Sequence, residues 1–282
     1  MPLVKMKEIL DVARNEKYAL GAFEFWSLDS AQAVVEAAAE LNLPTILQAG
    51  FIECEFAGGV ENLYKLAKMV ADESPVPVAL HIDHAEDFDF ISSALDAGFT
   101  SVMIDASKLS FTENVKITRK VVEAARPYGV SVEAELGKLA GNEGAVNVSE
   151  EEAAQTDPDD AVRFVKETGI DALAVAIGTA HGFYKFAPKI NIERLKEIAA
   201  KVSIPLVLHG GSGTPDEQVV EAIGHGIAKV NICTEFVAAF GETYIATQEQ
   251  PQYRYSIPSL FGPSKQAGKE LAKAKMKLFG RK

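Results

Sequence analysis

The chain repeats one pattern, in which a short apolar and β-branched run precedes an amphipathic stretch with helical spacing. The repeat recurs about every 25 to 40 residues, as expected of successive βα units. Strands are predicted at residues 19–25, 44–49, 76–83, 100–105, 130–136, 172–177, 204–209 and 228–233. Helices are predicted between them at 29–41, 61–72, 87–97, 112–125, 159–168, 192–202 and 215–225, each with one apolar stripe and an opposite charged face.

Eight parallel strands are the number at which such a sheet closes into a barrel. Because no Pro-, Gly- or Ser-rich linker interrupts the pattern, we expect an α/β protein with a single (β/α)8 TIM barrel domain over residues 1–282. The first residues predict an additional N-terminal helix. A helical tail follows from Thr234, with a loop at 248–256 and a final basic helix from Pro263 onward, whose lysines complement the helix dipole.

Composition narrows the functional class. The net charge of −12 argues against nucleic-acid and membrane-surface binding, because both require basic faces. No apolar run reaches membrane-spanning length and the N-terminal pattern is not that of a signal peptide, so we expect a soluble, cytoplasmic protein. Two cysteines, Cys54 and Cys233, are too few for a disulfide framework.

Ionisable groups end the third predicted strand, in the run Val78-Ala-Leu-His-Ile-Asp-His84. Along a strand, His81 and Asp83 point to one side, and His84 is expected to turn away as the strand ends. A hydrogen-bonded His-Asp pair that closes the core is the alternative to a functional site here.

The distribution of the five histidines favours a metal site. His84, His181 and His209 each follow a different predicted barrel strand, and such strand ends converge on the face that carries active sites. Three imidazoles around one open position would make a catalytic zinc-type site. His81 is better placed to orient its neighbours, and His225 to cap a helix.

Glycine-rich connections follow the seventh and eighth predicted strands. His209-Gly-Gly-Ser-Gly213 and Asn231-Ile-Cys-Thr234 each join a strand to a helix and expose backbone N–H groups. The loops at these two positions form the usual phosphate site of this fold. We therefore expect an anionic substrate group there.

Carboxylates complete the set. Asp105 ends the fourth strand, Glu133 and Glu135 end the fifth, and Glu143 lies in the Gly-rich loop that follows. Asp105 and Glu135 would repel one another, so a second divalent or monovalent cation or a shared proton is expected. A mobile loop could bring Glu143 to the site. Together these groups suggest enediolate chemistry beside a carbonyl.

Five ordered motifs resemble the class II, metal-dependent fructose- and tagatose-bisphosphate aldolases over residues 21–235. They are His81-Ile-Asp-His84, Ser131-Val-Glu-Ala-Glu-Leu-Gly137, Ala176-Ile-Gly-Thr-Ala-His-Gly182, His209-Gly-Gly-Ser212 and Asn231-Ile-Cys-Thr234. The resemblance implies a (β/α)8 barrel that reversibly cleaves a ketose bisphosphate or ketose 1-phosphate into dihydroxyacetone phosphate and an aldehyde. It also implies a role in carbohydrate metabolism such as glycolysis, and a homodimer or homotetramer.

The resemblance also implies roles for individual residues. Asp83 would exchange a proton with the C4 hydroxyl, and Glu143 would exchange one with dihydroxyacetone phosphate. Catalytic Zn²⁺ would be held by His84, His181 and His209, and a second cation by Asp105 and Glu135. The donor phosphate half would be held by Gly182, Lys185, Gly210, Gly211, Ser212, Asn231, Ile232, Cys233 and Thr234.

Departures from the family pattern concentrate on the other half of the substrate. Glu24 replaces a usual asparagine, Gly50 replaces a phosphate-binding serine, and the distal-phosphate arginine of the tail has no clear counterpart, unless Arg254 or Lys265 supplies it. We therefore hypothesise that the aldehyde is not a standard phosphorylated one, but is neutral or bears a cation that pairs with Glu24.

Two other functions stay open. A sugar-phosphate isomerase or epimerase would use the same enediolate chemistry, and a non-catalytic sugar-phosphate-binding barrel would keep the fold alone. The presence of Asp83, Glu143 and three histidines weighs against the non-catalytic alternative.

Overall fold

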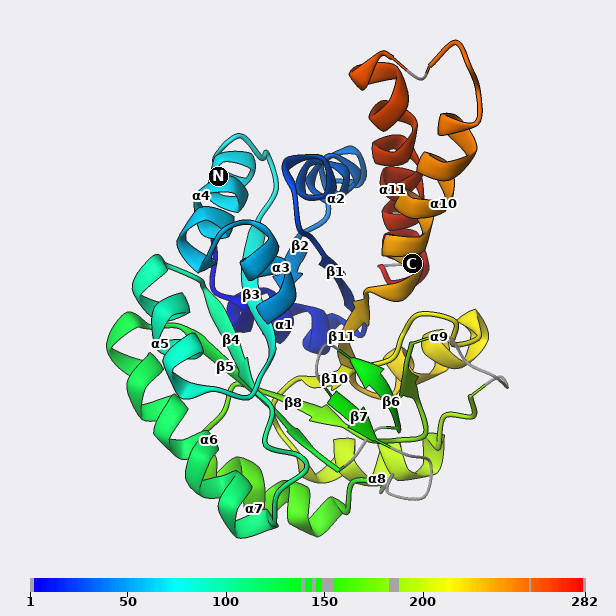
Figure 1. The fold of residues 1–282 in the computed structure, drawn as a ribbon. Coiled ribbons are helices and arrows are strands. Elements are labelled where there is room, and N and C mark those ends of the chain that lie inside the picture. Colours follow the sequence, from blue (N-terminus) through cyan, green and yellow to red (C-terminus); the bar gives the residue numbers. More distant parts are fainter. Residues whose placement is uncertain are drawn as a thin grey trace.

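The computed structural model describes residues 3–137, 140–143, 146–148, 155–182, 188–253 and 255–280, and the side chains of 140–143, 146–148 and 181 lie outside the described part. Eight parallel strands close a barrel in the order β1-β11-β10-β8-β5-β4-β3-β2 (Figure 1). This confirms the predicted TIM barrel. The strands are β1 (Leu20–Glu24), β2 (Thr45–Ala49), β3 (Val78–Ala85), β4 (Ser101–Ile104), β5 (Ser131–Leu136), β8 (Ala172–Val175), β10 (Leu206–Leu208) and β11 (Ile227–Ile232).

Helices surround the barrel and bury their apolar stripes against the strands (Figure 1). They are α2 (Leu28–Leu41), α4 (Val60–Asp72), α5 (Phe88–Ala97), α6 (Phe111–Ala125), α7 (Pro158–Thr168), α8 (Ile192–Lys201) and α9 (Asp216–Gly224). The short helix α3 (Phe51–Phe56) and the 3-10 turn η1 (Arg126–Tyr128) were not predicted, because each is too short to show a periodicity. Among the described residues, no helix has both the length and the apolar character needed to cross a bilayer.

The N-terminal helix α1 (Met6–Glu16) closes one end of the barrel. Its buried residues Met6, Ile9, Leu10 and Ala13 pack in one cluster with inward-facing barrel residues, which are mostly small: Ala22, Ala79, Ala172, Ala174, Ala228, Leu20, Ile46 and Val207. Alanine at these positions leaves space for the helix side chains. The metal-ligand candidates lie towards the opposite, C-terminal end of the strands.

The tail forms two helices, α10 (Thr234–Gln248) and α11 (Ile257–Phe279), which lie side by side in Figure 1. The prediction that the last helix begins at Pro263 was wrong. Ser256 caps the helix by accepting a hydrogen bond from the Ser259 amide, and Pro263 lies inside it. The loop predicted at 248–256 is confirmed for its described residues except Gln248, which ends α10.

The basic residues of α11 do more than complement its dipole. Lys265 and Lys269 pair with Glu36 of α2 at 2.6 and 3.2 Å, and Lys269 and Lys273 both pair with Glu40 at 2.6 Å. These contacts hold the pKa of Glu40 at about 2, through hydrogen bonds from Lys269 and Lys273. Because α11 also packs against β1, the ion pairs fix the tail to the barrel.

A small three-stranded sheet, absent from the predictions, consists of β6 (Ala140–Glu143), β7 (Val146–Val148) and β9 (Ala180–His181). β6 pairs antiparallel with β7 and parallel with β9, so that Gly141 lies opposite His181. The segment expected to be a Gly-rich loop is therefore partly strand. This pairing brings the strand that ends at Glu143 next to the segment that carries His181.

Candidate active site

His84 reaches the barrel mouth through an irregularity in β3. The register between β3 and β4 shifts between Ile82 and Ala85, and His84 has a φ of 43°, in the left-handed region. A bulge of this kind redirects a side chain. The strand was predicted to end at Asp83 with His84 turning away, but it continues to Ala85.

Two imidazole rings from distant parts of the chain face each other at this mouth. Nε2 of His84 lies 2.7 Å from Nδ1 of His209, and the rings are nearly perpendicular with centroids 4.5 Å apart. The other nitrogen of each ring contacts a carboxylate. Nδ1 of His84 lies 3.0 Å from Asp105, and Nε2 of His209 lies 2.9 Å from Glu133.

These carboxylates determine which nitrogens of the two rings carry protons. Burial raises the pKa of each carboxyl, but His84 and Ser107 hold that of Asp105 below its ordinary value, and Lys229 and His209 hold that of Glu133 at about 2. An ionised carboxylate only accepts hydrogen bonds, so each ring must donate its outer N–H. Burial also lowers the pKa of His209, which favours the neutral ring.

With both rings neutral, the facing nitrogens of His84 and His209 would be two lone pairs 2.7 Å apart, an arrangement that either a proton on one nitrogen or a cation bound by both would satisfy. A carboxylate behind a histidine is the usual support of a metal ligand, because it fixes the tautomer and raises the basicity of the ring. Asp83 offers an oxygen within 4.8 Å of both rings. The residues therefore fit a divalent metal ion.

A second group of potential ligands adjoins the first. His84, Asp105 and Glu135 each place one ligand atom within 4.8 Å of the others. Oε2 of Glu135 lies 3.7 Å from Nδ1 of His209. The predicted proximity of Asp105 and Glu135 is thus present, and both are buried, at 8% and 2% exposure.

Amide and cationic groups surround the carboxylate of Asp83, which lies beside the two imidazole rings. Its Oδ2 accepts hydrogen bonds from the side-chain amides of Gln48 at 3.1 Å and Asn231 at 3.0 Å. Burial would raise the pKa of Asp83, yet His84 and Lys229 hold it well below the ordinary value. Asp83 is therefore an ionised proton acceptor, 3% exposed, beside the two rings.

Lys229 is a functional candidate that the sequence analysis missed. This residue is completely buried, and its ammonium lies 2.9 Å from Glu133 and 3.9 Å from Asp83. A buried lysine is found almost only when it is paired. The available signal was the alternation in β11, where Lys229 and Asn231 share one face of an otherwise apolar strand.

The loop after β10 packs closely against β11 and the start of α10. Gly210 has a φ of 67°, and a Cβ on Gly211 would lie 2.5 Å from Val230 and 2.7 Å from the carbonyl oxygen of Asn231. Gly211 is therefore required by close packing of this loop on β11. The amide of Gly213 donates to Glu235 at 2.7 Å, and Ser212 is buried at 6% exposure.

Comparisons with known proteins agree with this geometry. The family model "Fructose-bisphosphate aldolase class-II" matches residues 4–282. The chain belongs to this family. It is 41% identical to a fructose-bisphosphate aldolase of Staphylococcus epidermidis, with 99% of this chain and 98% of the relative covered. A fructose-bisphosphate aldolase of Geobacillus stearothermophilus is 42% identical over the same shares.

A solved structure extends the likeness. The crystal structure of the YdjI aldolase from Escherichia coli K12 superposes with a TM-score of 0.87 at 37% identity, covering 99% of this chain and 98% of the other. The chain is thus a metal-dependent lyase of the class II aldolase type.

Two carboxylates meet at the backbone amide of Gly50. Glu24, at the end of β1, lies 3.2 Å from the Gln48 amide and accepts a hydrogen bond from the Gly50 amide at 3.2 Å. Glu53 accepts from the same Gly50 amide at 3.0 Å. Since Gly50 caps α3, the N–H that could bind an anion there already faces two negative charges.

Several residues predicted for the site have side chains outside the described part of the structure, so their roles stay predictions. The side chains of His181 and Glu143, and Lys185 and Arg254 as a whole, lie outside the described residues. Gly182 follows β9 with a φ of 86°. Ile232 ends β11, half-buried Cys233 precedes α10, and Thr234 begins that helix, so all three lie at the predicted loop. Lys265 binds Gln32 and Glu36 instead of facing the site.

Proposed function

We propose that this chain catalyses the reversible cleavage of a ketose phosphate into dihydroxyacetone phosphate and an aldehyde, with Zn²⁺ as the metal. The observation that carries the proposal is the pair of facing nitrogens of His84 and His209 beside the ionised carboxylate of Asp83. His181 would complete the ligand set. A second cation would be held by Asp105 and Glu135, which share a cluster with His84.

The residues of the chain would divide the reaction between them. The donor phosphate would lie at Gly182, Lys185, Gly210, Gly211, Ser212 and Asn231–Thr234, where backbone N–H groups and the start of α10 favour an anion. Gln48 and Asn231 orient the Asp83 carboxylate by their amide hydrogen bonds.

Proton transfer would then involve two carboxylates. Asp83 would remove the proton of the C4 hydroxyl while the C3–C4 bond breaks and its electron pair stays on C3. Glu143 would return a proton to that carbon, giving dihydroxyacetone phosphate. A divalent ion bound by the histidines supplies Lewis-acid polarisation of the ketone and stabilises the developing negative charge.

The aldehyde half is proposed to lack a phosphate. Any distal phosphate near Gly50 would meet Glu24 and Glu53, which both accept from that amide. Two like charges at such distances oppose an anion strongly when water is excluded. A neutral aldehyde, or one with a cation for Glu24, would avoid this cost.

A coupled assay for dihydroxyacetone phosphate tests the proposal. Ketose 1-phosphates should release it, a chelator should abolish release, and Zn²⁺ should restore it. Conversion of substrate without free dihydroxyacetone phosphate would identify an isomerase or epimerase instead, and no conversion across a panel of ketose phosphates would favour a binding protein. Cleavage of fructose or tagatose bisphosphate as efficient as that of a 1-phosphate would reject the proposed aldehyde specificity.

The assembly and location of the enzyme are further parts of the proposal. Homodimers or homotetramers and a cytoplasmic location follow from the family resemblance. Light scattering coupled to size exclusion would give the subunit number, and a single monomeric peak at enzyme concentrations used for the assay would reject the oligomer.

A further inference from the structure

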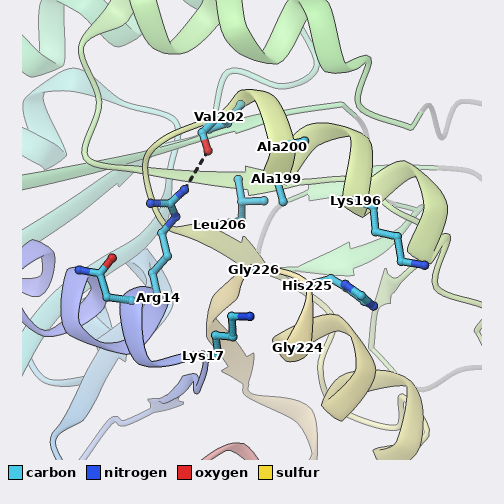
Figure 2. Close-up of a pocket in the computed structure, with 11 residues that line it drawn as sticks. Arg14, Lys17, Lys196, Ala199, Ala200, Val202, Leu206, Gly224, His225 and Gly226 are labelled. Atoms are coloured by element: carbon cyan, nitrogen blue, oxygen red, sulfur yellow. Dashed lines mark hydrogen bonds between the residues drawn. The ribbon is translucent and has the colours of Figure 1, made fainter.

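A second polar pocket lies at the opposite end of the barrel from His84 and His209. It has a volume of about 410 Å³ and is bordered by the end of α1, the end of α8 and the turn between α9 and β11 (Figure 2). Leu206 and Gly226, where β10 and β11 begin, form part of its wall. Because the proposed donor-phosphate loops follow the ends of these same strands, the two sites lie at opposite ends of the barrel.

Basic side chains dominate this pocket. Arg14, Lys17, Lys196 and His225 line it, and no carboxylate belongs to its wall. Lys196 pairs with Glu193 at 2.7 Å. Within the described ranges, neither Arg14 nor Lys17 forms an ion pair with a carboxylate. Such a local excess of positive charge is notable in a chain whose net charge is −12, and it would concentrate anions there.

A ligand in this pocket would be bound by side chains, because the nearby backbone amides already have hydrogen-bond partners. The amides of Lys17, His225 and Gly226 already donate to carbonyl groups of the helix ends that they cap. Arg14 donates through one guanidinium nitrogen to the Val202 carbonyl at 3.1 Å, a contact that orients the group at the pocket wall (Figure 2). The guanidinium has five N–H donors, so others remain for a planar or tetrahedral anion.

We propose that this pocket binds a small phosphorylated anion. Arg14, Lys196 and His225 bring a guanidinium, an ammonium and an imidazole to one pocket from three different elements, and arginine in particular recognises phosphate oxygens by paired hydrogen bonds. The volume falls within the range of small-molecule sites and exceeds what one inorganic ion needs. The site is separate from the aldolase chemistry and does not depend on the proposed reaction.

Gly224 provides a sharp test because it lines the pocket and has open space around it. A Cβ placed on Gly224 meets no atom within 4 Å, and its position at the end of α9 tolerates a side chain. Gly224→Glu would put a negative charge into the pocket, and Gly224→Gln is the matched neutral control. Lys17→Asn removes a positive charge with a residue that tolerates the left-handed φ of 57° at this position.

The experiment is calorimetric titration of the metal-loaded full chain with inorganic phosphate at low ionic strength. We expect wild type and Gly224→Gln to bind within threefold of each other, and Gly224→Glu and Lys17→Asn to bind at least fivefold more weakly, with a loss of affinity as KCl is added. If all four proteins bind phosphate equally, the phosphate binds at the opposite end of the barrel, at the aldolase site. Equal affinity of Gly224→Glu and Gly224→Gln, or the absence of binding to wild type, would overturn the proposal.

Cleavage rates without added phosphate provide the folding control. Gly224 and Lys17 lie outside the catalytic machinery, so all four proteins should have the same turnover. If turnover is equal and, of the two Gly224 variants, only Gly224→Glu binds phosphate more weakly, the result supports phosphate binding in this pocket. This conclusion holds whatever substrate the aldolase site accepts. Weaker binding by both Gly224 variants to the same degree would indicate a steric effect and reject recognition by charge.

Discussion

Nε2 of His84 and Nδ1 of His209 lie 2.7 Å apart although 125 residues separate them in the chain. Asp105 and Glu133 each engage the outer nitrogen of one ring, so the inner nitrogens are left to share a proton or to bind a cation together. The fold therefore prepares two ligands for a cation before one binds. This preparation depends on the β3 bulge, which turns His84 towards His209.

Removing the carboxylate behind His84 should weaken metal binding. Asp105→Asn can offer the ring a donor in place of an acceptor, which permits the wrong tautomer, and loss of such support typically costs 10 to 100-fold in affinity. Competition with a fluorescent Zn²⁺ chelator measures the change. Asp72→Asn, in a surface pair with Lys68, is the matched control and should bind as wild type does.

Substitutions at Asp83 and His209 should separate chemistry from metal binding. Asp83→Ala is expected to retain stoichiometric Zn²⁺ but lose most cleavage, because the acceptor of the C4 hydroxyl proton is gone. His209→Ala should lose both. Metal analysis and the coupled assay on the same samples decide this, and near-normal turnover by Asp83→Ala would reject its role.

Removing only one partner of the Lys229–Glu133 ion pair should strongly lower the free energy of unfolding. Lys229→Met leaves a carboxylate buried without its ammonium, and such changes destabilise by about 3–5 kcal/mol. Urea unfolding of the metal-free protein measures the loss. Lys68→Met at an exposed pair should change stability by about 0–1 kcal/mol. Adding Glu133→Gln to Lys229→Met should recover part of the loss, and no recovery would argue against the pairing as the cause.

The two cysteines should differ in reactivity over a wide pH range. Burial, with a contribution from Glu53, raises the pKa of Cys54 to about 12, so its thiol stays protonated at every pH below that value. Iodoacetamide at pH 8.5 should modify half-buried Cys233 but not Cys54 in the native protein, and both after unfolding. Peptide mass spectrometry gives the sites. Dihydroxyacetone phosphate should protect Cys233, and modification of native Cys54 at the same rate would contradict the buried assignment.

Restoring the usual family residues near Gly50 should shift substrate preference. Gly50→Ser places its Cβ 3.2 Å from the end of the flexible Glu53 side chain, so the serine fits after a small adjustment. Combined with Glu24→Asn, it should raise kcat/KM for a ketose 1,6-bisphosphate relative to the 1-phosphate by tenfold or more. An unchanged ratio would show that Glu24 does not control the distal end.

The sequence predicted the barrel because its strands are apolar runs of ordinary length separated by clear helical patterns. It also grouped Asp83, His84, Asp105, Glu135 and His209, since strand ends of one barrel converge. Two features lay beyond it, because the His84 bulge has no sequence marker and the β6–β9 pairing joins two distant loops. The alternation in β11 marked Lys229, but its partner Glu133 comes near only in the closed barrel.

The start of α11 shows how local signals compete. Pro263 suggested a first-turn position, yet Ser256 and Pro258 already supply a cap and an N-terminal proline. Packing on α2, with ion pairs from Lys265, Lys269 and Lys273, makes the longer helix favourable despite the interior proline.

The central claim is most directly tested by anomalous diffraction at the zinc edge from crystals of the metal-loaded protein. We predict a single strong peak about 2.0–2.1 Å from both Nε2 of His84 and Nδ1 of His209, with the Asp83 carboxylate beside it. A peak elsewhere, with those two nitrogens remaining 2.7 Å apart and no ion beside them, would contradict the account.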